Sequence, residues 1–196
     1  MTGRRPRLIL ASASPRRRQL LSEAGYDFEV VAPVVEEVQP EKLTVREATS
    51  YNALRKGLAV ARAHPGRVVL AADTLVALDH QLIGKPADRA DAARLLRLLS
   101  GRTHVVASGV FIAHLHRGRS IAFSVLSRVQ FKKLREKMIA DYLDTIDPLD
   151  KAGAYAAQGK GGAIIARILG SRSNVIGLPL EKTATALDLF EIRPRA

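Results

Sequence analysis

The chain has 196 residues, 47% of them hydrophobic, which suits one domain or two closely joined lobes and argues against a disordered or fibrous protein. Its 31 Lys and Arg residues outnumber the 19 Asp and Glu residues, and the formal charge of +12 favours an anionic partner such as a phosphate compound or nucleic acid. No apolar stretch reaches the roughly eighteen residues that cross a bilayer, so no membrane partner is expected.

Hydrophobic periodicity and breaker residues divide the chain into strands and helices. In chain order they predict a strand over 7–11, a helix over 15–24, a strand over 28–31, a helix over 44–64, a strand over 68–72 that continues over 75–78, a helix over 88–99, strands over 105–115 and 120–131, a helix over 132–145, a strand over 163–168 and a helix over 179–190. A hairpin turn is expected over 116–119. Together they predict an α/β domain with a mixed β-sheet flanked by helices, in which some neighbouring strands are antiparallel.

The turn between the first strand and the first helix carries two hydroxyl and two guanidinium groups, from Ser12, Ser14, Arg16 and Arg17. Ser14 as N-cap and Pro15 at the first helical position place the turn at a helix N-terminus, where backbone N–H groups and the helix dipole favour an anion. Basic residues in a first turn oppose that dipole, so they indicate a negative partner. The alternative is a capped helix with a solvated basic turn.

Asp73 and Thr74 directly follow the apolar run over 68–72, at a strand end where α/β sheets tend to place ligand-binding groups. A carboxylate there can hold a divalent cation or orient a water molecule, and Glu36 and Glu37 supply further carboxylates after the second strand. The alternatives are a turn or cap for Asp73 and a solvated loop for the two glutamates. Pairing these carboxylates is therefore a hypothesis.

Two lysines and one glutamine complete the candidate set. Lys85 stands between a glycine and a proline, and a compact ammonium group fixed there suits a phosphate oxygen, although the flanking residues are not those of a Walker A loop. Lys56, on a largely apolar helix, is a weaker candidate whose alternative is a surface lysine. Residues 150–159 combine small residues, which permit close approach of a ligand, with Gln158, which can read the edge of a base.

Taken in order, these motifs resemble the Maf family over nearly the whole chain. The matching stretches are LILASASPRRRQLL, AADTLVALDHQLIGKP, AARLLRLLSGRTHVVASGV, DKAGAYAAQG and GSRSNVIGLPL. Any one of them is weak, whereas five in the right order are highly specific. The resemblance implies one domain over residues 1–196 with no separate linker, an elongated α/β fold of two lobes around a deep cleft, related to inosine triphosphate pyrophosphatases. The sequence departs from the family pattern at Asn52, at Gly57, where Ala is usual, and at Ala157.

The resemblance also implies a role for each candidate residue. The residues that would bind the substrate phosphates are Ser12, Ser14, Arg16 and Arg17. Those that would form the catalytic cluster are Glu37, Lys56, Asp73 and Lys85. Within that cluster Asp73 would be the proton acceptor, and Glu37 and Asp73 would hold a divalent cation, Mg²⁺ or Mn²⁺. Base preference would depend on Arg16, Thr74 and Gln158, which are the residues of the branch that hydrolyses dTTP and UTP.

The expected activity is a nucleoside triphosphate pyrophosphatase that hydrolyses dTTP and UTP, or modified nucleotides, to the monophosphate and pyrophosphate by attack of water at the α-phosphate. The alternative is a nucleotide- or nucleic-acid-binding regulator, linked to cell division, that does not turn over its ligand. A pure binder would not need the set of Glu37, Asp73 and Lys85. Nucleic acid is also a weaker prediction because aromatic residues make up only 5% of the chain.

Assembly and location follow from weaker signals. Relatives of this fold often form dimers, so the resemblance leaves a homodimer open. The apolar run after Arg7 is too short for a signal peptide and is followed at once by further arginines, so the cytoplasm is the expected location.

Overall fold

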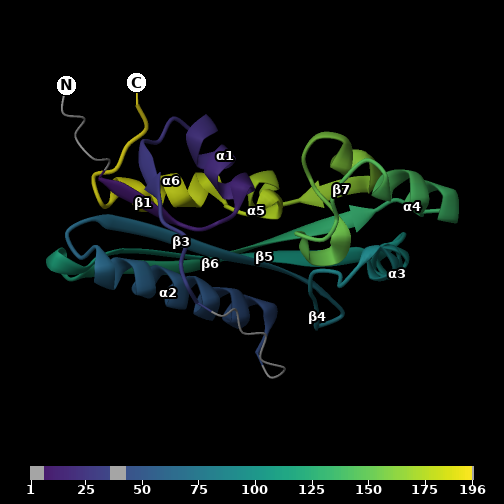
Figure 1. Cartoon of the computed structure of the whole chain (residues 1–196), viewed down its shortest axis with the longest axis horizontal. Helices are drawn as coiled ribbons and strands as arrows, with labels where there is room; N and C mark the ends of the chain where they lie inside the picture. The colour runs from purple at the N-terminus through teal and green to yellow at the C-terminus, as the bar shows by residue number, and fades with distance from the viewer. Residues whose placement is uncertain (1–6, 36–42, 196) are drawn as a thin grey trace.

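The computed structural model describes residues 7–35 and 43–195, which fold around a mixed seven-stranded sheet (Figure 1). Its strands are β1 (Leu8–Ala11), β2 (Phe28–Val30), β3 (Val68–Leu78), β4 (Gln81–Ile83), β5 (Thr103–His114), β6 (Arg119–Phe131) and β7 (Ile165–Leu169). The strand order is β2-β1-β3-β5-β6-β7, with β4 paired to β3. Strand β1 runs parallel to β2 and β3, and the other pairs are antiparallel, so the predicted mixed sheet is confirmed.

Helices cover both faces of this sheet. They are α1 (Pro15–Glu23), α2 (Val45–Ala63), α3 (Arg89–Leu99), α4 (Glu136–Leu143), α5 (Arg172–Ile176) and α6 (Leu180–Asp188). Helix α2 lies along one face, α1 and α6 lie along the other, and α3 and α4 lie at the far end of the sheet (Figure 1). Within the described ranges, none of these helices combines the length and apolarity needed to span a bilayer.

Strand β1 is apolar throughout because both of its faces are buried. Successive strand residues point to opposite faces of a sheet. Leu8 and Leu10 pack in the cluster that includes α1 and α6, whereas Ile9 and Ala11 pack in the cluster that includes α2. A strand covered on both faces needs an unbroken apolar run.

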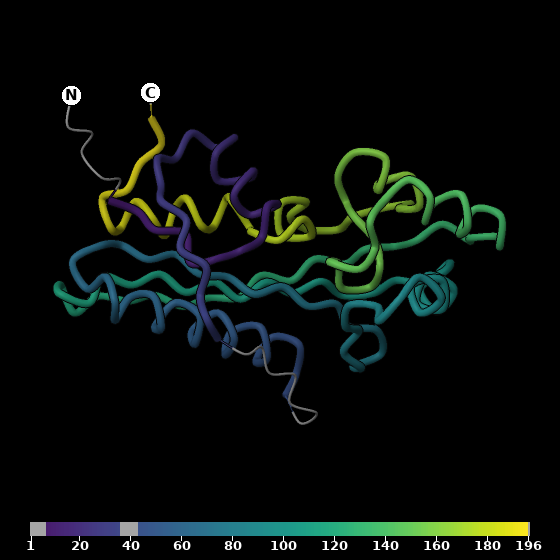
Figure 2. Tube along the Cα trace, viewed as in Figure 1, coloured from purple at the N-terminus to yellow at the C-terminus, as the bar shows by residue number. Residues whose placement is uncertain are grey.

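The three longest strands, β3, β5 and β6, run side by side along the molecule, as the Cα trace in Figure 2 shows. Beyond the reach of β1, β3 and β5 contribute Val76 and Val106 to a third apolar cluster, which packs against α3 and α4. The middle of β3 therefore lies between two separate packed ends. Asp73 and Thr74 are located in this middle stretch, paired with Gly109 and Ser108 of β5.

The largest error in the predicted elements is the helix over 132–145, which begins only at Glu136. The preceding residues are used in contacts with other segments: the Lys132 N–H donates to the Ile164 carbonyl at 2.9 Å, and the Leu134 N–H donates to Ser100 Oγ at 2.7 Å. The five-residue helix α5 was missed, because a single turn has too few positions to show a helical period.

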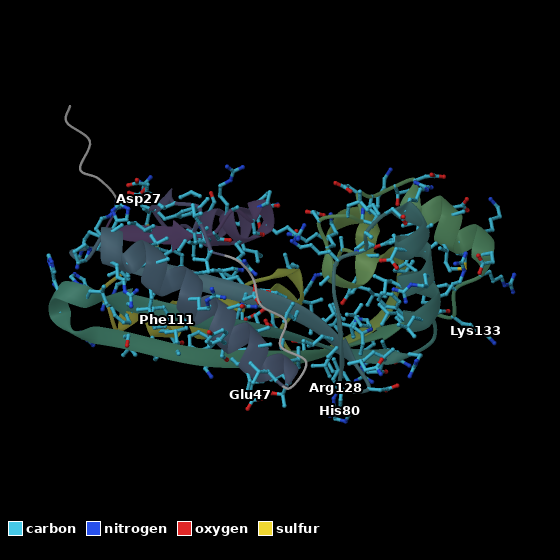
Figure 3. All side chains as sticks on the ribbon, turned by 60° about the horizontal axis from the view of Figure 1, so that its bottom comes forward. Asp27, Glu47, His80, Phe111, Arg128 and Lys133 are labelled. Carbon is cyan, nitrogen blue, oxygen red and sulfur yellow. The ribbon has the colours of Figure 1, made fainter. Side chains whose placement is uncertain are left out.

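Gly57 gives a first testable prediction. Although Ala is the better helix former by about 1 kcal/mol, a Cβ at Gly57 would overlap Phe111 Cδ1 and lie 3.1 Å from Cε1 of the same ring. Phe111 packs in the cluster under α2 (Figure 3). We therefore expect Gly57→Ala to lower the free energy of unfolding by about 1–2 kcal/mol, measured by urea denaturation. In a Phe111→Leu background the same change should cost less, and equal costs in both backgrounds would contradict the clash.

Candidate active site

A cleft of about 620 Å³ opens beside the end of β1 and the middle of β3. It gathers nine of the ten side chains that the sequence singled out: Ser12, Ser14, Arg16, Arg17, Lys56, Asp73, Thr74, Lys85 and Gln158. The tenth, Glu37, lies outside the described residues. Segments far apart in the chain thus meet at one site, while the role of each residue stays a prediction.

Asp73 is the most enclosed carboxylate of the cleft, with 3% of the residue exposed. Lys56 Nζ donates to its Oδ1 at 2.7 Å, and Asn52 Nδ2 donates to its Oδ2 at 3.1 Å. Lys56 and Asn52 are four residues apart on α2 and so project from the same side of the helix. These two donors fix the orientation of the carboxylate, and each of its oxygens has the capacity to accept a second bond.

The turn between β1 and α1 is held together by Arg17. Its Nε donates to the Gly177 carbonyl at 2.8 Å, Nη1 to Ser12 Oγ at 3.2 Å, and Nη2 to Thr74 Oγ1 at 3.1 Å. Ser12 Oγ also accepts from the Ser14 N–H at 3.2 Å. A nearly buried guanidinium at the N-terminus of a helix therefore adds positive potential at the cleft wall, alongside the helix dipole.

Arg16 lies across the cleft mouth from the loop that carries Asp150. Its Nη1 donates to Asp150 Oδ2 at 2.6 Å, and Lys151 Nζ also donates to that carboxylate. Partial burial would raise the pKa of Asp150, but the hydrogen bonds from Lys151 and Arg16 outweigh it, so the pKa lies below its usual value. Arg16 is thus paired with an ionised carboxylate in this structure.

Lys85 and Gln158 lie on two segments that are bonded to each other. The Gly153 N–H donates to the Gly84 carbonyl at 3.0 Å, which ties the residue before Lys85 to the loop that leads to Gln158. Gly153 has a φ of 72°, a left-handed conformation that favours glycine. Gly153, the glycine of the DKAGAY stretch, therefore has a structural role: it joins its loop to the segment that carries Lys85.

Three residues of the site or its support were not assigned from the sequence. Asn52 was noted only as a departure from the family pattern, yet its spacing of four from Lys56 was the signal that both face one target. Asp150 stood in a motif without a role. His104 lies just before the strand predicted over 105–115 and belongs to β5 in the structure, and no sequence pattern distinguishes such a buried histidine from a solvated one.

The described residues can hold a divalent cation only in part. Among them no group of three or more His, Cys, Asp or Glu side chains is placed to bind a metal ion. Asp73, with one further lone pair on each oxygen, fits the common arrangement in which one or two carboxylates and the substrate phosphates share Mg²⁺. The donor set thus suits a cation that arrives with a triphosphate better than a preformed protein cage.

His104 lies behind the cleft wall and contacts Tyr155, one of the lining residues. The residue is buried, its Nε2 lies 2.8 Å from the hydroxyl of Tyr155, and Tyr155 lines the cleft. The rings of His104 and Phe131 meet edge to face with centroids 4.9 Å apart. Burial lowers the pKa of His104 to about 4, so its imidazole is neutral near pH 7.

This depressed pKa predicts a pH-dependent stability. Between about pH 6.5 and pH 4 the unfolded state binds a proton at His104 that the folded state does not, so the stabilisation is complete above pH 6.5 and is lost as the pH falls towards 4. The loss should reach roughly 3 kcal/mol. Urea denaturation of His104→Gln should show a flatter pH dependence, whereas His80→Asn, at an exposed turn, should match the wild type. Parallel pH profiles for His104→Gln and wild type would refute the assignment.

Comparison with known proteins agrees with this arrangement of motifs. The family model described as "Maf-like protein" matches residues 7–190. A protein of Exiguobacterium sibiricum named dTTP/UTP pyrophosphatase is 44% identical over 95% of this chain and 94% of its own length. Proteins of the same name from Myxococcus xanthus and Bdellovibrio bacteriovorus are 45% and 41% identical, over 92% and 95% of this chain and 91% and 100% of their own lengths. The chain therefore belongs to the Maf family.

Proposed function

We propose that this protein is a nucleoside triphosphate pyrophosphatase that converts dTTP and UTP to the monophosphate and pyrophosphate. The observation that carries the proposal is the buried Asp73 carboxylate, held by Lys56 and Asn52 in a cleft whose other wall is rich in cations. A site with one oriented carboxylate and several positive groups suits water activation beside a polyphosphate. The curated relatives named dTTP/UTP pyrophosphatase support the same reading.

In the proposed reaction a water oxygen bonds to the α-phosphorus while the bond from that phosphorus to the oxygen bridging to the β-phosphorus breaks. Asp73 accepts the proton that the water loses, and pyrophosphate leaves with the electrons of the broken bond. Negative charge grows on the phosphate oxygens during this step. Lys85, Arg17 and the N-terminus of α1 line the cleft and would offset that charge.

A divalent cation, Mg²⁺ or Mn²⁺, is part of the proposal. Asp73 would be one ligand, and Glu37, outside the described residues, would be the second carboxylate. When bound, the cation would neutralise part of the triphosphate charge and polarise its phosphoryl oxygens. Lys56 would keep Asp73 in place beside it.

Base preference is proposed to come from Gln158. Gln158 carries an amide with both donor and acceptor atoms, and it lies on the same cleft as Arg16 and Thr74. An amide can pair with the adjacent carbonyl and N–H groups that uracil and thymine share. Gln158→Leu should therefore reduce the preference for UTP over CTP more than it reduces total turnover.

The test is pyrophosphate release from dTTP, UTP, CTP, 7-methyl-GTP and ITP with Mg²⁺, with Mn²⁺ and with a chelator. Metal-dependent release from dTTP and UTP is expected. Release centred on another base would retain the reaction and refute the base preference. Absence of release with every nucleotide and metal would refute the enzyme, and salt-dependent binding of DNA or nucleotide would then favour the regulator.

A further inference from the structure

The hydroxyl of Thr74 forms hydrogen bonds with other groups of the protein. Its Oγ1 accepts from Arg17 Nη2 at 3.1 Å, lies 2.8 Å from Ser108 Oγ, and lies 3.2 Å from the Gly177 carbonyl, to which it can donate. A hydroxyl offers one proton and two lone pairs. Arg17 fills one lone pair, and when the proton points to the Gly177 carbonyl Ser108 fills the other.

The proton of Thr74 can point in two directions, and neither leaves it for a nucleobase. If it points to the Gly177 carbonyl, Ser108 donates to Thr74, and both lone pairs of Thr74 are used. If it points to Ser108, then Ser108 donates onward to the Asn174 carbonyl at 3.3 Å. In both cases Thr74 accepts from Arg17. Although Thr74 lines the cleft, its hydroxyl is therefore placed to orient Arg17.

Ser108 is the buried end of this arrangement. It faces Thr74 directly across the β3–β5 pair and is 0% exposed, and it does not line the cleft. Its Oγ lies 2.8 Å from Thr74 Oγ1 and 3.3 Å from the Asn174 carbonyl. Ser108 is thus a buried, fixed partner that holds the hydroxyl of Thr74 in place.

The consequence falls on the guanidinium of Arg17. Three of its N–H groups point at Gly177, Ser12 and Thr74, acceptors on three different segments. A planar guanidinium recognises phosphate oxygens only in a defined orientation. Loss of the bond from Nη2 to Thr74 would let the guanidinium plane rotate, although its positive charge would stay in the cleft.

We propose that Ser108 is a positioning residue for the phosphate-binding Arg17, acting through the hydroxyl of Thr74. The inference rests on the proposed pyrophosphatase function, in which Arg17 offsets charge on the phosphates. Positioning of a charge-offsetting group acts on the transition state more than on ground-state binding. Its signature is a fall in kcat with little change in KM.

The experiment measures UTP turnover for Ser108→Ala, Thr74→Val and the double variant. Ser108→Ala and Thr74→Val should each lower kcat about tenfold or more, with KM changed less than about twofold, and the double variant should be no slower than Thr74→Val alone. Thr74→Ser, which keeps the hydroxyl, should restore most of the rate. If the fold-losses in kcat of the two single variants multiplied in the double variant, Ser108 would not act through Thr74.

Ser127→Ala is the matched control. Ser127 is also a buried serine near Asn174, but it is on β6 and its Oγ bonds to the Ser171 carbonyl and to Asn174 Nδ2, not to Thr74. Its removal should lower the melting temperature as Ser108→Ala does while leaving kcat unchanged. A fall in kcat with Ser127→Ala equal to that with Ser108→Ala would show that general loosening, and not positioning, is the cause.

A second readout separates this inference from the proposed function. In ¹⁵N-labelled protein, the Nε–H of Arg17, bonded to the Gly177 carbonyl, should exchange slowly with water. Exchange should become faster in Ser108→Ala and Thr74→Val, and stay slow in Ser127→Ala. Wild-type turnover with unchanged Arg17 exchange in Ser108→Ala would refute the positioning role alone. Absence of turnover by the wild type would refute the proposed function, and faster exchange would still support the link from Ser108 to Arg17.

Discussion

Asp73→Asn is expected to lower pyrophosphate release from UTP by about 10³-fold, because an amide cannot accept the proton of the attacking water. The substitution keeps the size of the side chain, and the hydrogen bond from Asn52 can be retained by the amide oxygen. Single-turnover rates at saturating UTP would measure the chemical step directly. A rate within tenfold of wild type would contradict the role of Asp73 as proton acceptor.

Loss of the Asp73 charge also affects folding, and the two effects need to be separated. Asp73→Asn removes the carboxylate that lies 2.7 Å from the buried ammonium group of Lys56. Breaking a buried pair on one side costs roughly 3–5 kcal/mol. The double variant Asp73→Asn/Lys56→Met removes both charges and should regain part of that stability while staying inactive. If the double variant recovered activity together with stability, unfolding would explain the single variant.

Asp79→Asn provides the matched carboxylate control. Asp79 is on the turn that follows β3, where it pairs with Arg102 and has a φ of 48°, a conformation that asparagine also tolerates. Because that pair is solvent-exposed, its loss should change the free energy of unfolding by less than about 1 kcal/mol. Turnover should match wild type.

The sequence predicted the sheet and most helices because their signals are local. The apolar runs over 68–72 and 75–78 predicted β3, and the helix predicted over 44–64 is α2, whose start carries a capping box of Thr44 and Glu47. Helix α4 was predicted four residues too long at its start, because the contacts of Lys132 and Leu134 with other segments are tertiary and leave no periodic trace. Local patterns thus located the longer elements, but not the short helix α5 or all of the element ends.

Part of the candidate site could likewise be predicted from the sequence, and part could not. Residues such as Asp73 and Lys85 could be selected because their motifs join a charged side chain to a strand end or a tight turn. The pairing of Lys56 with Asp73, and the use of Thr74 to hold Arg17, depend on how closely α2 and the β1–α1 turn approach the sheet. That approach is set by small residues on the facing strand, whose meaning appears only in three dimensions.

Gly109 is the residue that most directly sets the approach of α2. It faces Asp73 across the β3–β5 pair. A Cβ at Gly109 would lie 2.6 Å from the Ser50 backbone nitrogen and would overlap the carbonyl group of Thr49. These are backbone atoms of the helix that carries Asn52 and Lys56, so no side-chain rotation can relieve the overlap.

Gly109→Ala should therefore move α2 as a unit, lower the free energy of unfolding by about 3 kcal/mol or more, and reduce turnover about 100-fold in the fraction that stays folded. The second effect follows because a shift of about 1 Å at Lys56 and Asn52 displaces the two donors that orient Asp73. Urea denaturation and UTP turnover at a temperature where the variant is folded would measure both effects.

Gly66→Ala is the control for Gly109→Ala, since a Cβ at Gly66 would meet only the His116 ring, 3.4 Å from Nδ1 and 3.8 Å from Cε1. That variant should keep wild-type activity and nearly wild-type stability. If Gly109→Ala lost stability while the folded protein kept full turnover, the alignment of Asp73 would not depend on the depth of α2. Loss of both, with Gly66→Ala unaffected, would identify the missing Cβ of Gly109 as the feature that lets α2 bring Lys56 and Asn52 to the carboxylate.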